Sequence, residues 1–262
     1  MLAAERQSII VELIHENGSV QVEELALQLN VSPMTIRRDL MKLQEDNKVE
    51  RCHGGAVAKQ EVTYADKQTS HKEEKKKIAR TCLSFVKEGD TVFLDAGTTT
   101  YEIARLIKDI PGIMIVTNDL EIAQLLKSSD AELFICGGNI QKSTGSMFGR
   151  YATDMLADFK FDVGFFGAAS INASFEVTTP TMEKMWLKRE TPKQCEKSYL
   201  VVDQSKFDRQ AMAKINDLGD YTGVVTDKKF DLRERKRLDD LGAIIVEAVS
   251  YTHLTLATRY SV

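Results

Sequence analysis

The feature that most constrains this chain is an alternation of short apolar runs with helical stretches from residue 78 onward. The seven runs are Thr91–Asp95, Ile113–Thr117, Glu132–Cys136, Asp162–Phe166, Tyr199–Asp203, Tyr221–Thr226 and Ala243–Val249. Each run has the length of a buried strand, and helical segments separate most of them. This pattern predicts a doubly wound α/β domain with a mainly parallel sheet, whose ligand site lies at the carboxyl ends of the strands.

Small and polar residues follow several of these runs. In DAGTTT, which starts at Asp95, glycine lets the backbone approach a ligand, and the first amides of the next helix are donors that suit a phosphate. Lys206 can offer a point charge to a phosphate, and Asp95 can accept sugar hydroxyls. The candidate effector-binding residues are Asp95, Gly97, Thr98, Thr99, Thr100, Asn118, Gly137, Gly138, Gly167 and Lys206. The alternative for DAGTTT is an ordinary capped turn, and the absence of GxxxxGK[ST] and GxGxxG disfavours a nucleotide.

The first 56 residues follow a different plan. Apolar spacing predicts helices over residues 5–16 and 22–29, and a third helix begins after Ser32, a good N-cap, with Pro33 at its first position. Lys48–Ala56 is predicted to be a small hairpin that turns on two glycines. Two helices joined by a tight turn and followed by a hairpin are typical of a winged helix-turn-helix, whose later helix enters the major groove of DNA.

The charges of this segment need a closer look, because it holds six basic and nine acidic residues. The whole chain has a net charge of -4 and a pI near 5.7, which argues against generic polyanion binding. However, the outward face of the third helix carries Arg38 and Lys42 without an acid. The candidate DNA-binding residues are Ser32, Met34, Thr35, Arg37, Arg38, Lys42, Arg51 and His53. The alternative is a helical protein-contact domain in which Arg37 and Arg38 are solvated charges.

Other classes of site have less support. Asp95, Glu183 and Asp203 are candidate acid–base carboxylates, but no histidine follows a strand and no pair is shown to converge. The four cysteines lack metal or disulfide spacing, so neither a metal nor a cofactor is expected. No membrane-length apolar run and no secretory opening are present, which predicts a cytoplasmic protein that does not bind membranes. Lys75–Lys77 is expected to be an exposed helix start, and Trp186, with Met182 and Met185, to serve core or interface packing.

The stretch VSPMTIRRDLMKLQEDNKVERCHGGA, residues 31–56, resembles the signature of the DeoR family of bacterial regulators of sugar metabolism. The likeness continues through KKIA, LDAGTTT, VTND, CGG and DQSKF, and covers about residues 3–249. It implies a winged helix-turn-helix followed by a domain similar to sugar-phosphate isomerases, and homodimers or homotetramers. It also implies repression of a sugar catabolism or transport operon, relieved when a phosphorylated sugar intermediate binds. The positions that match its motifs are Thr35, Arg37 and Arg38 for DNA, and Asp95, Gly97, Thr98, Thr99 and Lys206 for the effector.

We therefore predict a DNA-binding domain over residues 1–56, a linker over 57–72 and a sugar-phosphate-binding effector domain over 73–249. Residues 250–262, which have no counterpart in the family pattern, are expected to be a non-native or disordered tail. The expected partners are double-stranded operator DNA and a sugar phosphate, and no enzymatic activity is expected. The alternative is a sugar-phosphate isomerase with an accessory DNA-binding domain, and the sequence does not distinguish repression from activation.

Overall fold

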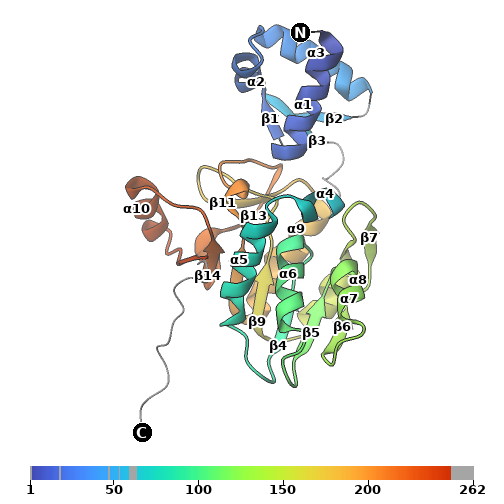
Figure 1. Ribbon diagram of the computed structural model, residues 1–262, viewed down its shortest axis with the longest axis vertical. Coiled ribbons are helices and arrows are strands. Elements are labelled where there is room, and N and C mark those ends of the chain that lie inside the picture. Colours follow the sequence, from blue (N-terminus) through green and yellow to red (C-terminus); the bar gives the residue numbers. More distant parts are fainter. Residues whose placement is uncertain (1, 18, 47, 53, 59–63, 249–262) are drawn as a thin grey trace.

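The structure is a computed structural model that describes residues 2–17, 19–46, 48–52, 54–58 and 64–248 (Figure 1). The predicted tail and His53 lie outside these residues. The described chain has an N-terminal helical part and a larger α/β part, each with a hydrophobic core of its own. No described helix is both long and apolar enough to cross a membrane.

The N-terminal part contains the three predicted helices and the predicted hairpin. Its elements are α1 (Ala3–Asn17), β1 (Ser19–Gln21), α2 (Val22–Gln28), α3 (Pro33–Glu45), β2 (Val49–Cys52) and β3 (Gly55–Ala58). Helix residues Ile10, Leu25 and Leu40 meet in its core. Strand β1 was not predicted, because its three residues become a strand only through antiparallel pairing with the distant β3, giving the sheet order β1-β3-β2.

The two positions of the hairpin, residues 54 and 55, require glycine for different structural reasons. Gly54 has a φ of +80°, in the left-handed region that favours glycine. Gly55 lies against β1, where a Cβ atom would be 2.0 Å from the carbonyl oxygen of Val20. The carbonyl oxygen of Gly54 also accepts a hydrogen bond from the backbone N–H of Val22 at 2.8 Å. The pair therefore both turns the wing and lets it approach the start of α2.

The α/β part is built on one large sheet. Its strands are β4 (Thr91–Leu94), β5 (Met114–Thr117), β6 (Glu132–Ile135), β9 (Phe161–Phe166), β12 (Cys195–Val201), β14 (Gly223–Thr226) and β15 (Ile245–Glu247). These are the seven predicted runs with slightly different bounds, and every pair of neighbours among the described strands is parallel. The order is β15-β14-β12-β9-β4-β5-β6, so the direction in which the chain adds strands reverses between β4 and β9. A crevice for a ligand is expected at such a reversal.

Helices cover both faces of the sheet, which explains why its strands are mostly apolar. The helices are α4 (Tyr64–Thr69), α5 (Lys72–Leu83), α6 (Thr98–Ile107), α7 (Leu120–Leu126), α8 (Arg150–Ala157), α9 (Met182–Glu190) and α10 (Leu232–Asp240), with 3-10 turns at Thr191–Gln194, Gln204–Lys206 and Leu218–Asp220. One core joins the sheet to α5, α6 and α7, and the other joins it to α8, α9 and α10. Within β4, Val92 and Leu94 enter the first core and Phe93 enters the second.

Smaller strands form in loops for which no strand was predicted. They are the antiparallel hairpin of β7 (Asn139–Gln141) and β8 (Ser146–Phe148), and the antiparallel sheet of β10 (Ser170–Ile171), β11 (Glu176–Thr179) and β13 (Ala213–Asp217). Each is two to five residues long, and β13 joins its sheet by pairing with β11 from a distant part of the chain. Helix α4 lies within the predicted linker, and β3 continues to Ala58, past the predicted domain boundary.

The structure contradicts the prediction for Lys75 and one alternative of the prediction for Trp186 and Met182. Lys75 was expected at an exposed helix start, but it is only 3% exposed, because α5 packs on α6 with Lys75 beneath α4. Trp186, with Met182 and Met185, was expected in a core or an interface, and the structure leaves Trp186 58% exposed and Met182 also exposed on the outer face of α9. Only Met185 of that group is buried, so the core alternative is wrong for the other two and the interface alternative stays a prediction.

Candidate DNA-reading surface and effector site

Helix α3 begins with the predicted cap. The Ser32 hydroxyl accepts a hydrogen bond from the Thr35 backbone N–H at 3.2 Å, and its Oγ lies 2.9 Å from Thr35 Oγ1. Ile36 and Leu40 are buried beneath the helix, whereas Met34 is 64% exposed. The cap therefore holds the first turn of α3 with its outer face toward solvent, as a groove-reading helix requires.

The basic side chains of this surface differ in their surroundings. Arg38 is exposed on α3, and Arg37 forms an exposed ion pair with Glu23 of α2 at 3.3 Å. Lys42 is exposed and pairs with Asp46 at 3.2 Å, and the hydrogen bond to Asp46 raises the pKa of Lys42 above its usual value. Arg51 is exposed on β2, the first strand of the wing. His53, predicted at the same wing, is not among the described residues.

A buried ion pair beneath this surface escaped the sequence analysis. Arg6 of α1 meets Asp39 of α3 through Nε–Oδ2 at 2.5 Å and Nη2–Oδ1 at 3.2 Å, and Gln7 Nε2 donates to Oδ1 at 3.1 Å. The two charged side chains are 11% and 5% exposed. The bidentate contact fixes α3 against α1, and its only sequence signal is an acid on the otherwise apolar side of α3.

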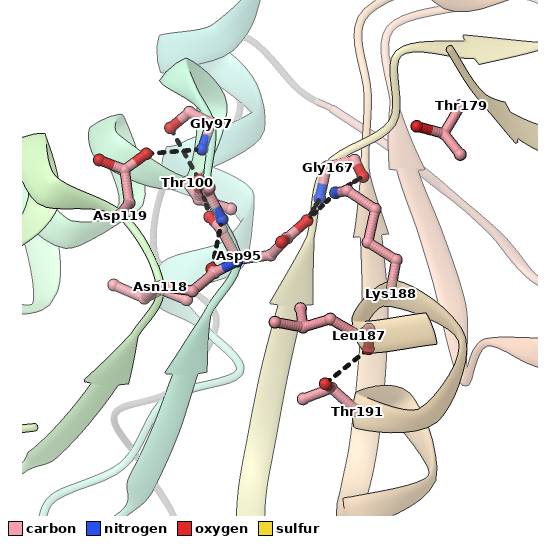
Figure 2. A network of polar contacts seen from close by, with 12 residues as sticks. Asp95, Gly97, Thr100, Asn118, Asp119, Gly167, Thr179, Leu187, Lys188 and Thr191 are labelled. Atoms are coloured by element: carbon pink, nitrogen blue, oxygen red, sulfur yellow. Dashed lines mark hydrogen bonds and ion pairs between the residues drawn. The ribbon is translucent and has the colours of Figure 1, made fainter. Parts of the chain in front are cut away.

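The effector candidates gather around the reversal point of the sheet. Asp95, which is fully buried, follows β4, and Gly167 follows β9. Asp95 Oδ2 accepts a hydrogen bond from the Gly167 N–H at 3.1 Å and an ion pair from Lys188 Nζ, and Lys188 also donates to the Gly167 carbonyl oxygen at 2.9 Å. Figure 2 shows Lys188 reaching from α9 to these two strand ends. The structure thus joins two predicted residues with Lys188, a lysine that the sequence analysis had not selected.

The loop from β4 into α6 is held by a second group of contacts. Asp119 accepts hydrogen bonds from the N–H of Gly97 at 3.0 Å and from two amides of α7, and burial raises its pKa to about 6. Asn118 Oδ1 accepts from the Ala96 N–H at 2.8 Å, and its amide donates to Met147. The Thr100 hydroxyl donates to the carbonyl oxygens of Asp95 and Gly97. Asn118, Asp119 and Thr100 therefore shape the loop through backbone contacts (Figure 2).

A cationic corner lies beside the start of α6. Lys75 Nζ donates to the carbonyl oxygens of Lys67 and Ser70, and the Thr98 hydroxyl lies 3.5 Å from the same Lys67 oxygen. Burial, and then the nearby positive charge of Lys206, lower the pKa of Lys75 to about 8, while Asp203 opposes that change. Thr98 and Thr99 are buried in the first turn of α6, whose leading amides have no partner inside the helix. This corner therefore suits an anion.

Two predicted glycines lie further away. Gly137 and Gly138 follow β6, the edge strand, which is two strand positions, about 10 Å, from β4. A Cβ atom on Gly138 would lie 2.4 Å from the Phe148 carbonyl oxygen. This close approach to β8 is sufficient to explain why residue 138 is glycine, and no ligand contact is needed for that explanation.

The comparisons with known proteins agree with this two-part construction. Residues 6–62 match the DeoR-like helix-turn-helix domain, and residues 70–228 match the DeoR C-terminal sensor domain. The chain is 34% identical over 254 residues to the HTH-type transcriptional regulator GlpR of Haloferax volcanii, which covers 95% of this chain and 100% of that protein. It is 32% identical over 231 residues to the glycerol-3-phosphate regulon repressor of Escherichia coli, covering 87% and 92% of the two chains.

Among solved structures, ribose 5-phosphate isomerase A of Methanocaldococcus jannaschii is similar with a TM-score of 0.39 and 16% identity, over 53% of this chain and 55% of that one. The relatives that match nearly the whole chain are named as regulators rather than enzymes. Both parts of the chain, in this order, are accounted for by one family. The chain is a DNA-binding transcriptional regulator and belongs to the DeoR family.

Proposed function

We propose that this regulator is a repressor that binds operator DNA through α3 and the wing, and that a sugar or polyol phosphate bound beside α6 releases it. The observation that carries the proposal is the anion-suited corner of Lys75, Lys206 and the first turn of α6 in a chain that also exposes Arg38 on a capped helix. The name of the Escherichia coli relative, which refers to the glycerol-3-phosphate regulon, supports a small phosphorylated polyol.

In the DNA-binding half, the exposed first turns of α3 enter the major groove. Ser32, Met34 and Thr35 lie at the leading end of the helix, where base edges are contacted, and Arg37, Arg38 and Lys42 follow along it. Arg51 and His53 serve the phosphate backbone from the wing. Arg37 must exchange its surface pair with Glu23 for DNA, which costs little because exposed ion pairs contribute only about 0–1 kcal/mol.

The DNA half is tested with Arg38→Ala. An operator is first selected from random duplex DNA with the wild-type protein, and binding is then followed by fluorescence anisotropy. The variant should lose about 1–3 kcal/mol of binding free energy. Arg233→Ala, which removes an exposed arginine from α10 instead, is the matched control and should bind like wild type. Equal binding by both variants would show that α3 does not read DNA in this way.

In the effector half, the phosphate lies at the first turn of α6 near Lys75 and Lys206, and the sugar hydroxyls lie toward Asp95. Gly97, Thr98 and Thr99 form the backbone of the phosphate site, whereas Thr100, Asn118 and Gly167 hold its walls. Gly137 and Gly138 contribute to the outer rim. A ligand that binds only the folded state raises the melting temperature, so thermal shifts against a panel of sugar phosphates test this half. Free sugars are the control, and no shift with any phosphate would refute it.

We further propose that the protein works in the cytoplasm as a homodimer or homotetramer. A helix-turn-helix reads one half-site, and two-fold symmetric operators are matched by two-fold symmetric proteins. Sedimentation velocity at micromolar concentration, with and without the selected operator, measures this directly. A monomer that binds the operator with one-to-one stoichiometry would contradict the proposal.

A further inference from the structure

Asp95 has two carboxylate oxygens in different situations. Oδ2 accepts the Gly167 N–H at 3.1 Å and the ion pair from Lys188. Oδ1 is buried and has no hydrogen-bond partner among the described residues. A buried carboxylate oxygen without a partner is unfavourable, and it can be satisfied only by a donor, because an ionised carboxylate accepts hydrogen bonds and does not donate them. Oδ1 is therefore suited to a ligand group that carries a proton.

The position of Asp95 says which part of a ligand meets this oxygen. Asp95 lies three residues before Thr98, at the strand end that feeds the first turn of α6. A phosphate bound at that turn would place the carbon chain next to it within reach of Asp95. The carboxylate would repel the phosphate itself, so the group facing Oδ1 is a hydroxyl. Asp95 is thus suited to accept a hydrogen bond from a hydroxyl group of the ligand.

Lys188 controls how this oxygen is presented. Its ammonium group contacts Asp95 Oδ2 and the Gly167 carbonyl oxygen at 2.9 Å, so it ties the carboxylate to the end of β9. Lys188 is largely buried on α9, a helix anchored by Leu187 in the core, which restricts the movement of its side chain. With Oδ2 held by a cation and a backbone amide, Oδ1 remains as the acceptor.

We infer that Lys188 is a positioning residue that makes the site selective for a hydroxyl-bearing phosphate over a phosphate without hydroxyls. The inference rests on the proposed function and adds its specificity determinant. Lys188 does not touch the phosphate in this arrangement; it acts through Asp95. Its removal should therefore reduce recognition of the hydroxyl end while leaving recognition of the phosphate end unchanged.

The test compares inorganic phosphate, which can fill only the phosphate end, with glycerol 3-phosphate, ribose 5-phosphate and fructose 1-phosphate. Dissociation constants are measured on the full chain by calorimetry. In Lys188→Met, affinity for the preferred sugar phosphate should fall at least tenfold, with less than a twofold change for inorganic phosphate. Lys188→Arg should recover most of the lost affinity. Lys193→Met, which removes an exposed lysine paired with Glu190, is the control and should change the affinity for neither ligand.

If Lys188→Met is too unstable because it leaves Asp95 unpaired, the double variant Asp95→Asn with Lys188→Met removes both charges and should show the same selective loss. An equal loss for inorganic phosphate and sugar phosphate, or no loss for either, would overturn the role of Lys188 and leave the proposed function standing. If the wild-type protein binds none of the sugar phosphates, the proposed function and this inference both fail.

Discussion

The ion pair between Arg6 and Asp39 allows a quantitative prediction about the DNA-binding half. Arg6→Ala removes two hydrogen bonds, at 2.5 and 3.2 Å, from a carboxylate whose side chain is 5% exposed, and leaves it the bond from Gln7. Breaking a buried pair by removing one partner costs about 3–5 kcal/mol. Because Gln7 remains and Arg6 is partly exposed, we expect a value near the lower limit, about 3 kcal/mol.

Hydrogen exchange on the full chain measures this cost locally, because the two parts of the protein need not unfold together. In Arg6→Ala, the hydrogen-exchange protection factors of the α1 and α3 amides should fall by about two orders of magnitude, since about 1.4 kcal/mol corresponds to a factor of ten. Glu23→Gln, which breaks the exposed pair with Arg37, should change the protection from exchange by less than about fivefold.

Replacing both partners of the buried pair gives an independent check of the reasoning. The double variant Arg6→Met with Asp39→Leu should lie close to wild type, because an apolar pair avoids the desolvation of two charges. Unchanged protection of α3 in Arg6→Ala would refute the conclusion that this pair fixes the helix. Protection in the double variant as low as in Arg6→Ala would show that the loss reflects packing rather than an unpaired charge.

Three further predictions concern a cap, a glycine and a buried acid. Ser32→Ala removes the acceptor for the Thr35 N–H and should cost about 1 kcal/mol of local stability, seen as faster exchange confined to the first turn of α3. Gly55→Ala places a Cβ atom against the Val20 carbonyl oxygen and should cost about 1–3 kcal/mol; full amide protection of β1 in this variant would contradict it. Asp119 has a folded pKa of about 6, above the ordinary value near 4, so the folded protein binds the proton more tightly than the unfolded chain and loses stability as pH rises from about 4 to about 6. Asp119→Asn should therefore be more destabilising at pH 4 than at pH 7 in thermal unfolding followed by Trp186 fluorescence, and an equal cost at both pH values would be the opposing result.

Local patterns in the sequence determined much of this protein. The cap at Ser32, the apolar stripe of α3, the glycine hairpin and the seven apolar runs are all visible within a few residues, because each depends on backbone preference or on burial of one face. The same holds for DAGTTT, whose strand-to-helix turn forms at the predicted place. Together these features predicted the fold class, whereas the family was predicted from the resemblance of residues 31–56 and the later motifs to the DeoR signature.

Tertiary structure alone decided which of these pieces meet. The reversal of strand order between β4 and β9 depends on how whole elements pack, and it brings Asp95 to Lys188, 93 residues later in the chain. The burial of Lys75 beneath α4 and the contact of Arg6 with Asp39 arise in the same way. The sequence around a lysine or an aspartate is the same whether the folded side chain faces water or an opposite charge. Its spatial neighbours come from distant segments, so they cannot be predicted from the adjacent residues. The partners of these charged side chains are therefore a property of the packed molecule.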